Sequence, residues 1–365
     1  MQRLNKSLFI TCIILGVFGC IMIYSSSYIW AEFKYGNSLK YVINQSVFLL
    51  LGIICMYTFS KINYKFYEKK ANIILLVCFL LLVLVLLPGI GVVRNGSKSW
   101  FGIGGFGIQP SEISKIGLTI FIAKFLSRNN KDKRETKKFV IPVLLIILIF
   151  FALIMLEPDF GTGMVIVVSL TCLIFITGTK VGIFLKLGLA GLLGVVGLII
   201  AAPYRLERII SFLNPWSDPL GSGFQIIQSL YAIGPGGLLG FGFLNSRQKH
   251  FYLPEPQTDF IFSIISEEFG FLGILIISFL FLLLFYSAIK ISLNTNDLFG
   301  KYLSFGLSFM LIFQTILNLS VVIGLVPVTG VTLPFISYGG TSLVMSFISI
   351  GIILSVNKNN QTKPK

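Results

Sequence analysis

Long uninterrupted apolar runs constrain this chain more than any other feature. Hydrophobic residues make up 55% of it and charged residues 12%, against about 25% charged in a soluble domain. The runs are continuous rather than short and alternating, which predicts helices and not a barrel. About ten fit the roughly 20 residues that a bilayer-crossing helix needs, at 8–26, 42–60, 72–90, 112–127, 139–156, 162–178, 182–202, 262–289, 302–323 and 341–356. We therefore expect an all-α polytopic membrane protein that forms a single domain over residues 1–365.

Basic residues concentrate in alternate connections between these spans. With the N-terminus inside, the short outer connections hold only Lys34, Lys40, Arg94 and Lys98, whereas the inner segments hold Arg3, Lys6, Lys61, Lys65, Lys69, Lys70, Arg128, Lys131, Lys133, Arg134, Lys137, Lys138, Lys358, Lys363 and Lys365. By the positive-inside rule, both termini are predicted to be cytoplasmic and the large connection 203–258 to lie outside. The same pattern accounts for the net charge of +15 without a nucleic acid partner.

The residues that usually hold metals are sparse or scattered. The five cysteines all lie in apolar runs without paired spacing, and His250 is the single histidine. We interpret the cysteines as packing residues and expect no disulfide and no protein-built metal site.

Two outer segments place ionisable residues at the ends of spans. Glu112 and Lys115 are three residues apart, so on a helix they share a face and can pair. An ionisable pair at the end of a span indicates a functional region, although a purely structural interhelical pair is the alternative. In the tight turn after residue 156, Glu157 and Asp159 either bond the turn's own backbone or face a shared cavity, and the spacing leaves both open.

The connection 326–342 is too apolar to be freely solvated. It is therefore predicted to be a re-entrant or packed loop that lines a cavity, because lipid-facing irregular backbone is not tolerated. Ser337 and Tyr338 are the polar groups it offers there.

The large connection ends in a pattern that predicts a site. On a helix, Asp259, Ser263, Ser266 and Glu267 fall on one face, and such a polar stripe should face protein or a wet cavity rather than lipid. The alternative makes Thr258 an N-cap and Asp259 a first-turn acid that favours the helix dipole. Four basic residues lie in the same connection, Arg205, Arg208, Arg247 and Lys249.

Residues 221–243 begin amphipathically and end in glycines. The beginning predicts a helix on the membrane surface. The end lacks the lysine-serine pair and preceding strand of a phosphate loop, so we expect a flexible lip over the cavity.

One carboxylate with nearby cations suits a transferase that moves a sugar from a lipid diphosphate. Diphosphate already leaves well, so the reaction needs a base for the acceptor hydroxyl and positive charge at the diphosphate. A glycosidase would need a second carboxylate, which Glu157 or Asp159 could supply, and this weaker alternative stays open.

Several ordered blocks resemble the SEDS family, the shape, elongation, division and sporulation proteins, and most closely its FtsW and SpoVE members rather than RodA. The similarity covers nearly the whole chain and rests on the Trp100–Lys115 block, the turn at Pro158–Thr162, NPWSDPLGSGFQIIQS at 214–229, LPEPQTDFIF at 253–262, the EE-x-G block at 267–270 and PFISYGG at 334–340.

The resemblance implies a peptidoglycan glycosyltransferase that polymerises lipid II outside the membrane, inverting at the reacting carbon. It implies that Asp259 matches the family's essential aspartate and that Glu112, Lys115 and Asp159 lie near its cavity. A class B penicillin-binding protein is the implied partner, and a divalent cation, Mg²⁺ or Mn²⁺, could accompany the diphosphate. A lipid II flippase and a non-catalytic scaffold are the competing hypotheses.

Overall fold

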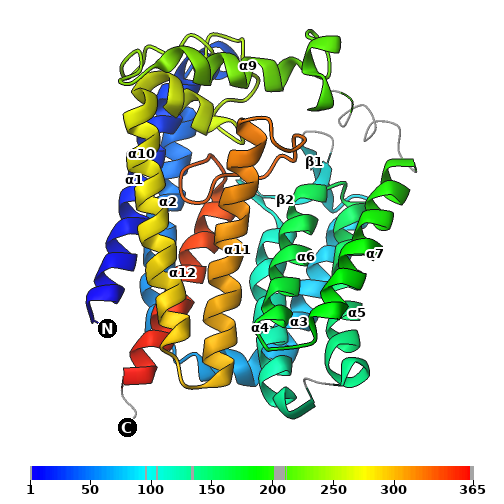
Figure 1. Cartoon of the computed structure of the whole chain (residues 1–365). Helices are drawn as coiled ribbons and strands as arrows, with labels where there is room; N and C mark the ends of the chain where they lie inside the picture. The colour runs from blue at the N-terminus through cyan, green and yellow to red at the C-terminus, as the bar shows by residue number, and fades with distance from the viewer. Residues whose placement is uncertain are drawn as a thin grey trace.

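A computed structural model of the chain describes residues 2–94, 97–103, 106–132, 135–200, 210 and 212–361. Long helices run side by side and a layer of short elements covers one end of them (Figure 1). The long helices are α1 (Gln2–Tyr35), α2 (Lys40–Lys61), α3 (Lys65–Leu86), α4 (Pro110–Arg128), α5 (Thr136–Leu156), α6 (Phe160–Phe175), α7 (Val181–Ile200), α10 (Ile261–Leu293), α11 (Leu298–Val322) and α12 (Gly340–Gln361).

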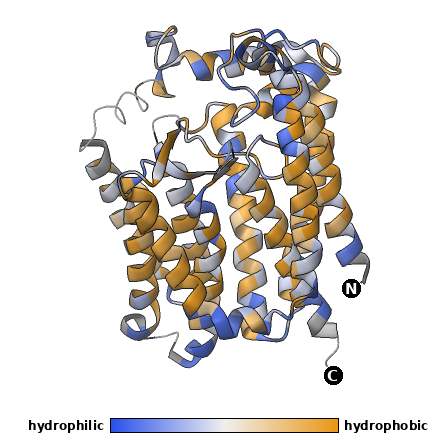
Figure 2. Cartoon of the chain, turned by 180° about the vertical axis from the view of Figure 1, so that it is seen from behind, coloured by the Kyte–Doolittle hydropathy of each residue, from blue (hydrophilic) through white to orange (hydrophobic). Residues whose placement is uncertain are grey.

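Each of the ten expected spans coincides with one of these helices. In the described part of the chain, seven of them (α1, α2, α3, α5, α10, α11 and α12) are long and apolar enough to cross a membrane. The 16 residues of α6 are short for a crossing, and α4 carries four charged side chains within its 19 residues. Apolar residues form a broad band across the helices, with hydrophilic residues gathered towards both ends (Figure 2). The chain is a multi-pass membrane protein, and the number of crossings stays a prediction.

A small antiparallel sheet joins α3 to α4, in a segment for which the sequence analysis predicted no strands. Among the described residues its strands are β1 (Gly91–Arg94), β2 (Ser97–Ile103) and β3 (Phe106–Ile108), in that order. Val92 pairs with Trp100 and Gly102 with Gly107. The β-branched and aromatic residues of this segment favour strands. The last strand ends two residues before Pro110, the first residue of α4.

Helix α10 is broken at Gly270, whose φ of 59° and ψ of −157° are not helical. Segment 237–242 fills the break. The N–H of Phe241 donates to the carbonyl of Glu267 at 2.9 Å, and the N–H of Phe271 donates to the carbonyl of Gly237 at 2.9 Å. The expectation of a flexible lip here is therefore wrong, because a broken helix leaves backbone groups that must find partners, and the glycine-rich segment supplies them.

The covering layer includes α9 (Phe224–Ile233), which lies across the end of the bundle (Figure 1). This helix was expected, but its apolar residues Ile226, Ile227 and Ala232 are buried and it packs on α10 and α11, so these side chains face protein rather than lipid. The short 3₁₀ helices are η1 (Asn130–Asp132), η2 (Pro215–Ser217) and η3 (Gly234–Gly236).

The connection between α11 and α12 is packed into the protein, as predicted. Leu333, Phe335 and Ile336 are buried. A Cβ on Gly19 of α1 would lie 2.7 Å from the backbone of Ile336, and one on Gly161 of α6 would lie 2.6 Å from the carbonyl oxygen of Thr329. The loop therefore touches two helices, α1 and α6, that lie far apart in the sequence.

Candidate active site

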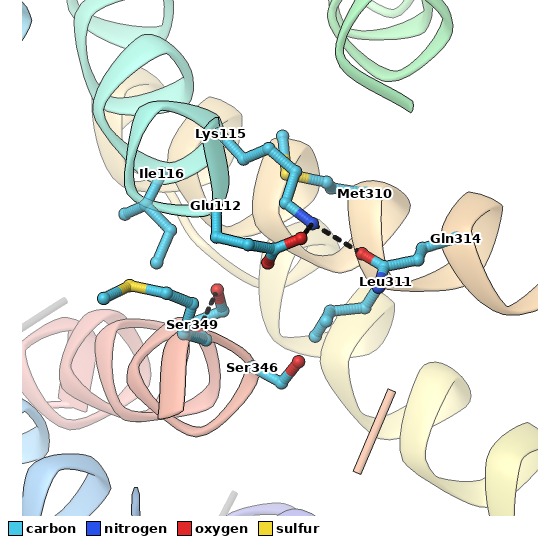
Figure 3. Close-up of a pocket in the computed structure, with 9 residues that line it drawn as sticks. Glu112, Lys115, Ile116, Met310, Leu311, Gln314, Ser346 and Ser349 are labelled. Carbon is cyan, nitrogen blue, oxygen red and sulfur yellow. Dashed lines mark hydrogen bonds and ion pairs between the residues drawn. The ribbon is translucent and has the colours of Figure 1, made fainter. Parts of the chain in front are cut away.

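Glu112 and Lys115 form the ion pair that their spacing on α4 predicts. Oε1 of Glu112 lies 2.8 Å from Nζ of Lys115, and Nζ also donates to Oε1 of Gln314 on α11 at 2.7 Å. Both charged side chains are buried, and Figure 3 shows them turned towards α11 and α12. They line a cavity of about 10 Å³, roughly the room that one water molecule needs. The extra hydrogen bond that Lys115 donates to Gln314 helps this pair to persist away from bulk water.

Asp159 bonds the backbone of its own turn, which is the first of the two alternatives that the sequence left open. It is the N-cap of α6 and accepts the N–H of Thr162 at 3.1 Å. Its Oδ2 accepts a hydrogen bond from Nε2 of Gln109 at 2.9 Å, so the cap ties α6 to the residue before α4. Burial raises the pKa of Asp159, and the N–H of Thr162 acts against that rise.

Glu157 behaves differently from Asp159. Its side chain is fully buried, and neither carboxyl oxygen has a hydrogen-bond partner among the described residues. Burial, together with repulsion from Asp159, raises the pKa of Glu157 from 4.5 to about 9. Glu157 is therefore protonated near pH 7, which is the state of the general acid of a glycosidase and not of its ionised carboxylate.

Asp259 lies in a turn, two residues before α10 begins at Ile261. It is half-buried, and its Oδ1 accepts a hydrogen bond from the hydroxyl of Thr258 at 2.8 Å. The carbonyl of Asp259 accepts from Nδ2 of Asn318 on α11 at 2.8 Å. The alternative with Thr258 as N-cap is wrong, because Phe260 occupies the cap. Asp259 thus keeps its carboxylate outside the helical turn.

The polar stripe below Asp259 faces protein, as predicted. Ser263 shares a hydrogen bond of 2.7 Å with Ser229 of α9. Glu267 accepts the backbone N–H groups of Arg247 and Gln248, at 2.9 and 3.3 Å. Both side chains are fully or almost fully buried, so they hold the covering layer on α10.

The four basic residues of the large connection do not share one environment. Lys249 is fully buried, and its Nζ pairs with Glu268 at 2.9 Å, where Ser25 of α1 also donates to the carboxylate. Arg247 is exposed, with its guanidinium 4.9 Å from the ring centre of Phe241. Arg205 and Arg208 lie outside the described residues. Lys249 therefore neutralises an internal carboxylate, and Arg247 is open to solvent.

Ser337 and Tyr338 tie their loop to neighbouring elements. The hydroxyl of Ser337 accepts the N–H of Leu333 at 2.8 Å. The N–H of Tyr338 donates to the carbonyl of Gln257 at 2.8 Å, and its ring packs edge-on against Tyr41 of α2 at 4.9 Å. The loop and the turn that carries Asp259 are thus one bonded unit.

Two residues that we did not single out from the sequence connect the predicted ones. Gln314 and Asn318 are buried on α11, one turn apart. Nε2 of Gln314 donates to the carbonyl of Thr332 at 3.0 Å, and Nδ2 of Asn318 donates to that of Val331 at 2.8 Å. A bonded path thereby joins the Glu112–Lys115 pair to Asp259. The signal was present in the sequence, because two amides four residues apart in an apolar span share a face and should point into protein.

Metal ligands do not gather in the part of the chain that the structure describes. No group of three or more His, Cys, Asp or Glu side chains there could hold a metal ion.

Comparisons with known proteins agree on one family. The family model described as "Cell cycle protein", FTSW_RODA_SPOVE, matches residues 5–362. This chain belongs to the FtsW/RodA/SpoVE family. Among its relatives, "Stage V sporulation protein E" of Bacillus subtilis (strain 168) is 48% identical over 351 residues, which is 96% of each chain. A "Probable peptidoglycan glycosyltransferase FtsW" of Geobacter sp. (strain M18) is 39% identical over 345 residues, or 94% of each chain.

Solved structures of the family share the fold. One, described as "Structural coordination of polymerization and crosslinking by a peptidoglycan synthase complex", has a TM-score of 0.81 at 30% identity and covers 98% of both chains. The crystal structure of Thermus thermophilus RodA has a TM-score of 0.71 at 25% identity and covers 98% of this chain and 97% of its own. The fold therefore matches these solved structures over nearly the whole chain.

Proposed function

We propose that this protein is a peptidoglycan glycosyltransferase that polymerises lipid II at the outer face of the cytoplasmic membrane, with Asp259 as the base. The observation that carries the proposal is the half-buried carboxylate of Asp259 just before α10, whose backbone carbonyl is held by Asn318 of α11. One turn away on α11, Gln314 bonds the buried Glu112–Lys115 pair. Full-length relatives that are named glycosyltransferases support the reaction class.

The reaction asks for one proton transfer and one displacement. Asp259 takes the proton from the acceptor sugar hydroxyl. The hydroxyl oxygen then bonds to the anomeric carbon of the second lipid II as the bond to diphosphate breaks, and the lipid diphosphate leaves with inversion. A positioned base of this kind contributes about 10²–10⁴-fold in rate.

Positive charge for the diphosphate comes, in this proposal, from the solvent-exposed Arg247 and from Arg205 and Arg208, with Mg²⁺ or Mn²⁺ accompanying the substrate. Arginine suits the task because its planar fork binds phosphate oxygens in pairs. Lys249 is left out, since Glu268 already holds its ammonium group. The chemistry of the bound diphosphate, rather than any metal ligand of the chain, would recruit the cation.

A class B penicillin-binding protein is the partner that we propose. A chain of the solved peptidoglycan synthase complex, whose description names polymerization and crosslinking, matches this protein over 98% of both chains. A transpeptidase on the same side of the membrane would use the glycan strand as it forms.

The first test is polymer formation from lipid II by purified protein, with and without the transpeptidase. Asp259→Asn should lower the rate by about 10²–10⁴-fold, because an amide cannot accept the proton. Glu32→Gln is the matched control, since it changes a solvent-exposed carboxylate at the end of α1 and should retain the parent rate. Full activity of Asp259→Asn would end the proposal, and lipid II translocation without polymer would favour a flippase.

A further inference from the structure

Asn318 joins two loops through a single side-chain amide. Its side chain is fully buried on α11. The two hydrogens of its Nδ2 go to two backbone carbonyls, those of Asp259 and Val331, each at 2.8 Å. A side-chain amide carries only two N–H hydrogens, so this donor is fully used in joining two loops.

The carbonyl of Asp259 needs a donor from elsewhere because α10, which begins after it, supplies none. Within a regular helix that carbonyl would accept the N–H of Ser263, but this N–H bonds to Phe260 instead, at 3.0 Å. A carbonyl held away from water must find another donor. Asn318 supplies the donor from a different helix, so the backbone of Asp259 takes its place from α11.

One turn earlier on α11, Gln314 connects the same loop to the Glu112–Lys115 ion pair. Gln314 holds the carbonyl of Thr332 and accepts from Lys115. Residues 331 and 332 are adjacent, so one short stretch of loop lies between the two amides. A shift of Asn318 would therefore move Asp259 relative to Lys115 and Glu112.

We propose that Asn318 is a positioning residue for the transfer reaction, which sets the Asp259 carboxylate at its working distance from the acceptor hydroxyl by holding the Asp259 backbone. This inference rests on the proposed function. Asn318 does not touch substrate in this account. Its removal lowers turnover rather than binding, because the groups that bind the lipid diphosphate stay in place.

The test compares initial rates over a range of lipid II concentrations for purified full-length variants. Asn318→Leu removes both donors with little change in volume, and Asn318→Asp keeps the shape but removes the NH₂ group. Both should lower kcat by about 10–100-fold, the effect of a misplacement of about 1 Å, with KM within about 3-fold of the parent value. The melting temperature in the same detergent is recorded for each variant.

Asn357→Leu is the matched control. Asn357 is also buried and bonds another helix through its amide, with Nδ2 2.7 Å from Oδ1 of Asn5, but it lies near the end of α12. It should lose as much melting temperature as Asn318→Leu while keeping its kcat. A parent-like kcat for Asn318→Leu, or an equal loss of kcat in Asn357→Leu, would overturn the inference.

Two further readouts separate the possible failures. If Asn318→Leu does not fold, the kcat of Asn318→Asp decides, and a parent-like value would overturn the inference. Asp259→Asn is assayed beside them. An active Asp259→Asn defeats the proposed function itself, whereas an inactive Asp259→Asn with a fully active Asn318→Leu defeats only the role of Asn318.

Discussion

Glu157 is a carboxyl group that the fold removes from water without giving it a hydrogen bond among the described residues. The same residue's backbone carbonyl is bonded, since it accepts from the hydroxyls of Ser97 and Ser99 on β2. A buried carboxyl without a donor stays protonated, because its charged form loses more hydration than its neutral form. Glu157 thereby links the outer turn to the sheet while carrying no charge near Asp159.

This protonation makes stability depend on pH. The pKa of Glu157 is about 9 in the folded protein and 4.5 ordinarily, so the folded state holds a proton that the unfolded state releases. The contribution of Glu157 to stability is therefore fully present below pH 4.5 and is lost as pH rises towards 9, by up to about 1.4 kcal/mol per pH unit. We expect the melting temperature to decline between about pH 5.5 and 8.5 and Glu157→Gln, neutral at every pH, to flatten the decline.

The control for that experiment is Glu32→Gln, whose carboxyl is exposed and whose melting curve should keep the parent slope. An unchanged slope in Glu157→Gln would show that Glu157 ionises as freely in the folded protein as in the unfolded chain.

At the scale of elements, the break in α10 holds the covering layer at the end of the bundle where α9 lies. Its first half presents Glu267 and Glu268, which hold the backbone of 246–248 and the ammonium of Lys249. Its second half continues through the membrane band. Segment 237–242 makes backbone hydrogen bonds to both halves of α10 across the break. The covering layer is therefore bonded to the membrane helix, and the turn that carries Asp259 is attached to a well-bonded part of the protein.

Gly270 is the residue that permits this arrangement. Its backbone lies in a region that is essentially restricted to glycine, and a Cβ there would lie 2.4 Å from the nitrogen of Gly240. Gly270→Ala should destabilise the protein by at least about 1–3 kcal/mol from backbone strain alone. Gly188→Ala on α7, where a Cβ meets nothing within 4 Å, should be neutral or stabilising by up to about 1 kcal/mol. Unfolding in detergent measures both, and equal effects would contradict the role of the break.

At the scale of the whole molecule, charge and shape agree on an orientation. The chain begins and ends at the same end of the bundle, opposite α9 (Figure 1). The basic connection between α4 and α5, which contains η1, lies at the end of the bundle opposite the covering layer (Figure 1). Since cytoplasmic loops carry the excess of Lys and Arg, we propose that both termini are cytoplasmic and that α9 is outside.

Cysteine labelling tests this orientation. In a variant whose five native cysteines are replaced, Ser222→Cys before α9 should react with a membrane-impermeant maleimide on intact cells. Lys131→Cys in η1 should react only after the membrane is opened. Both parent side chains are exposed, so accessibility within the protein does not distinguish them. Labelling of Lys131→Cys on intact cells would reverse the proposed topology.

The helices and the ion pair followed from the sequence because both depend on local patterns. Hydropathy over about 20 residues locates a membrane helix, and a spacing of three places Glu112 beside Lys115 on any helix. The packed loop 326–342 was likewise predictable, since apolar irregular backbone must lie against protein. In contrast, the sheet of β1–β3 was missed, because its short strands are interrupted by glycines that equally suit turns.

What the sequence alone determined is a helical membrane protein with a carboxylate at the start of the span that follows its largest connection. Only the tertiary structure decided that Asp259 precedes its helix, that Asn318, 59 residues away, holds it, and that Lys249 neutralises Glu268 beside Ser25. The physical reason is that the bilayer acts through local sequence, whereas hydrogen bonding of buried groups depends on distant residues. A bilayer acts on every residue of a span at once, whereas a buried polar group is satisfied by one partner that the fold brings from a distant part of the chain.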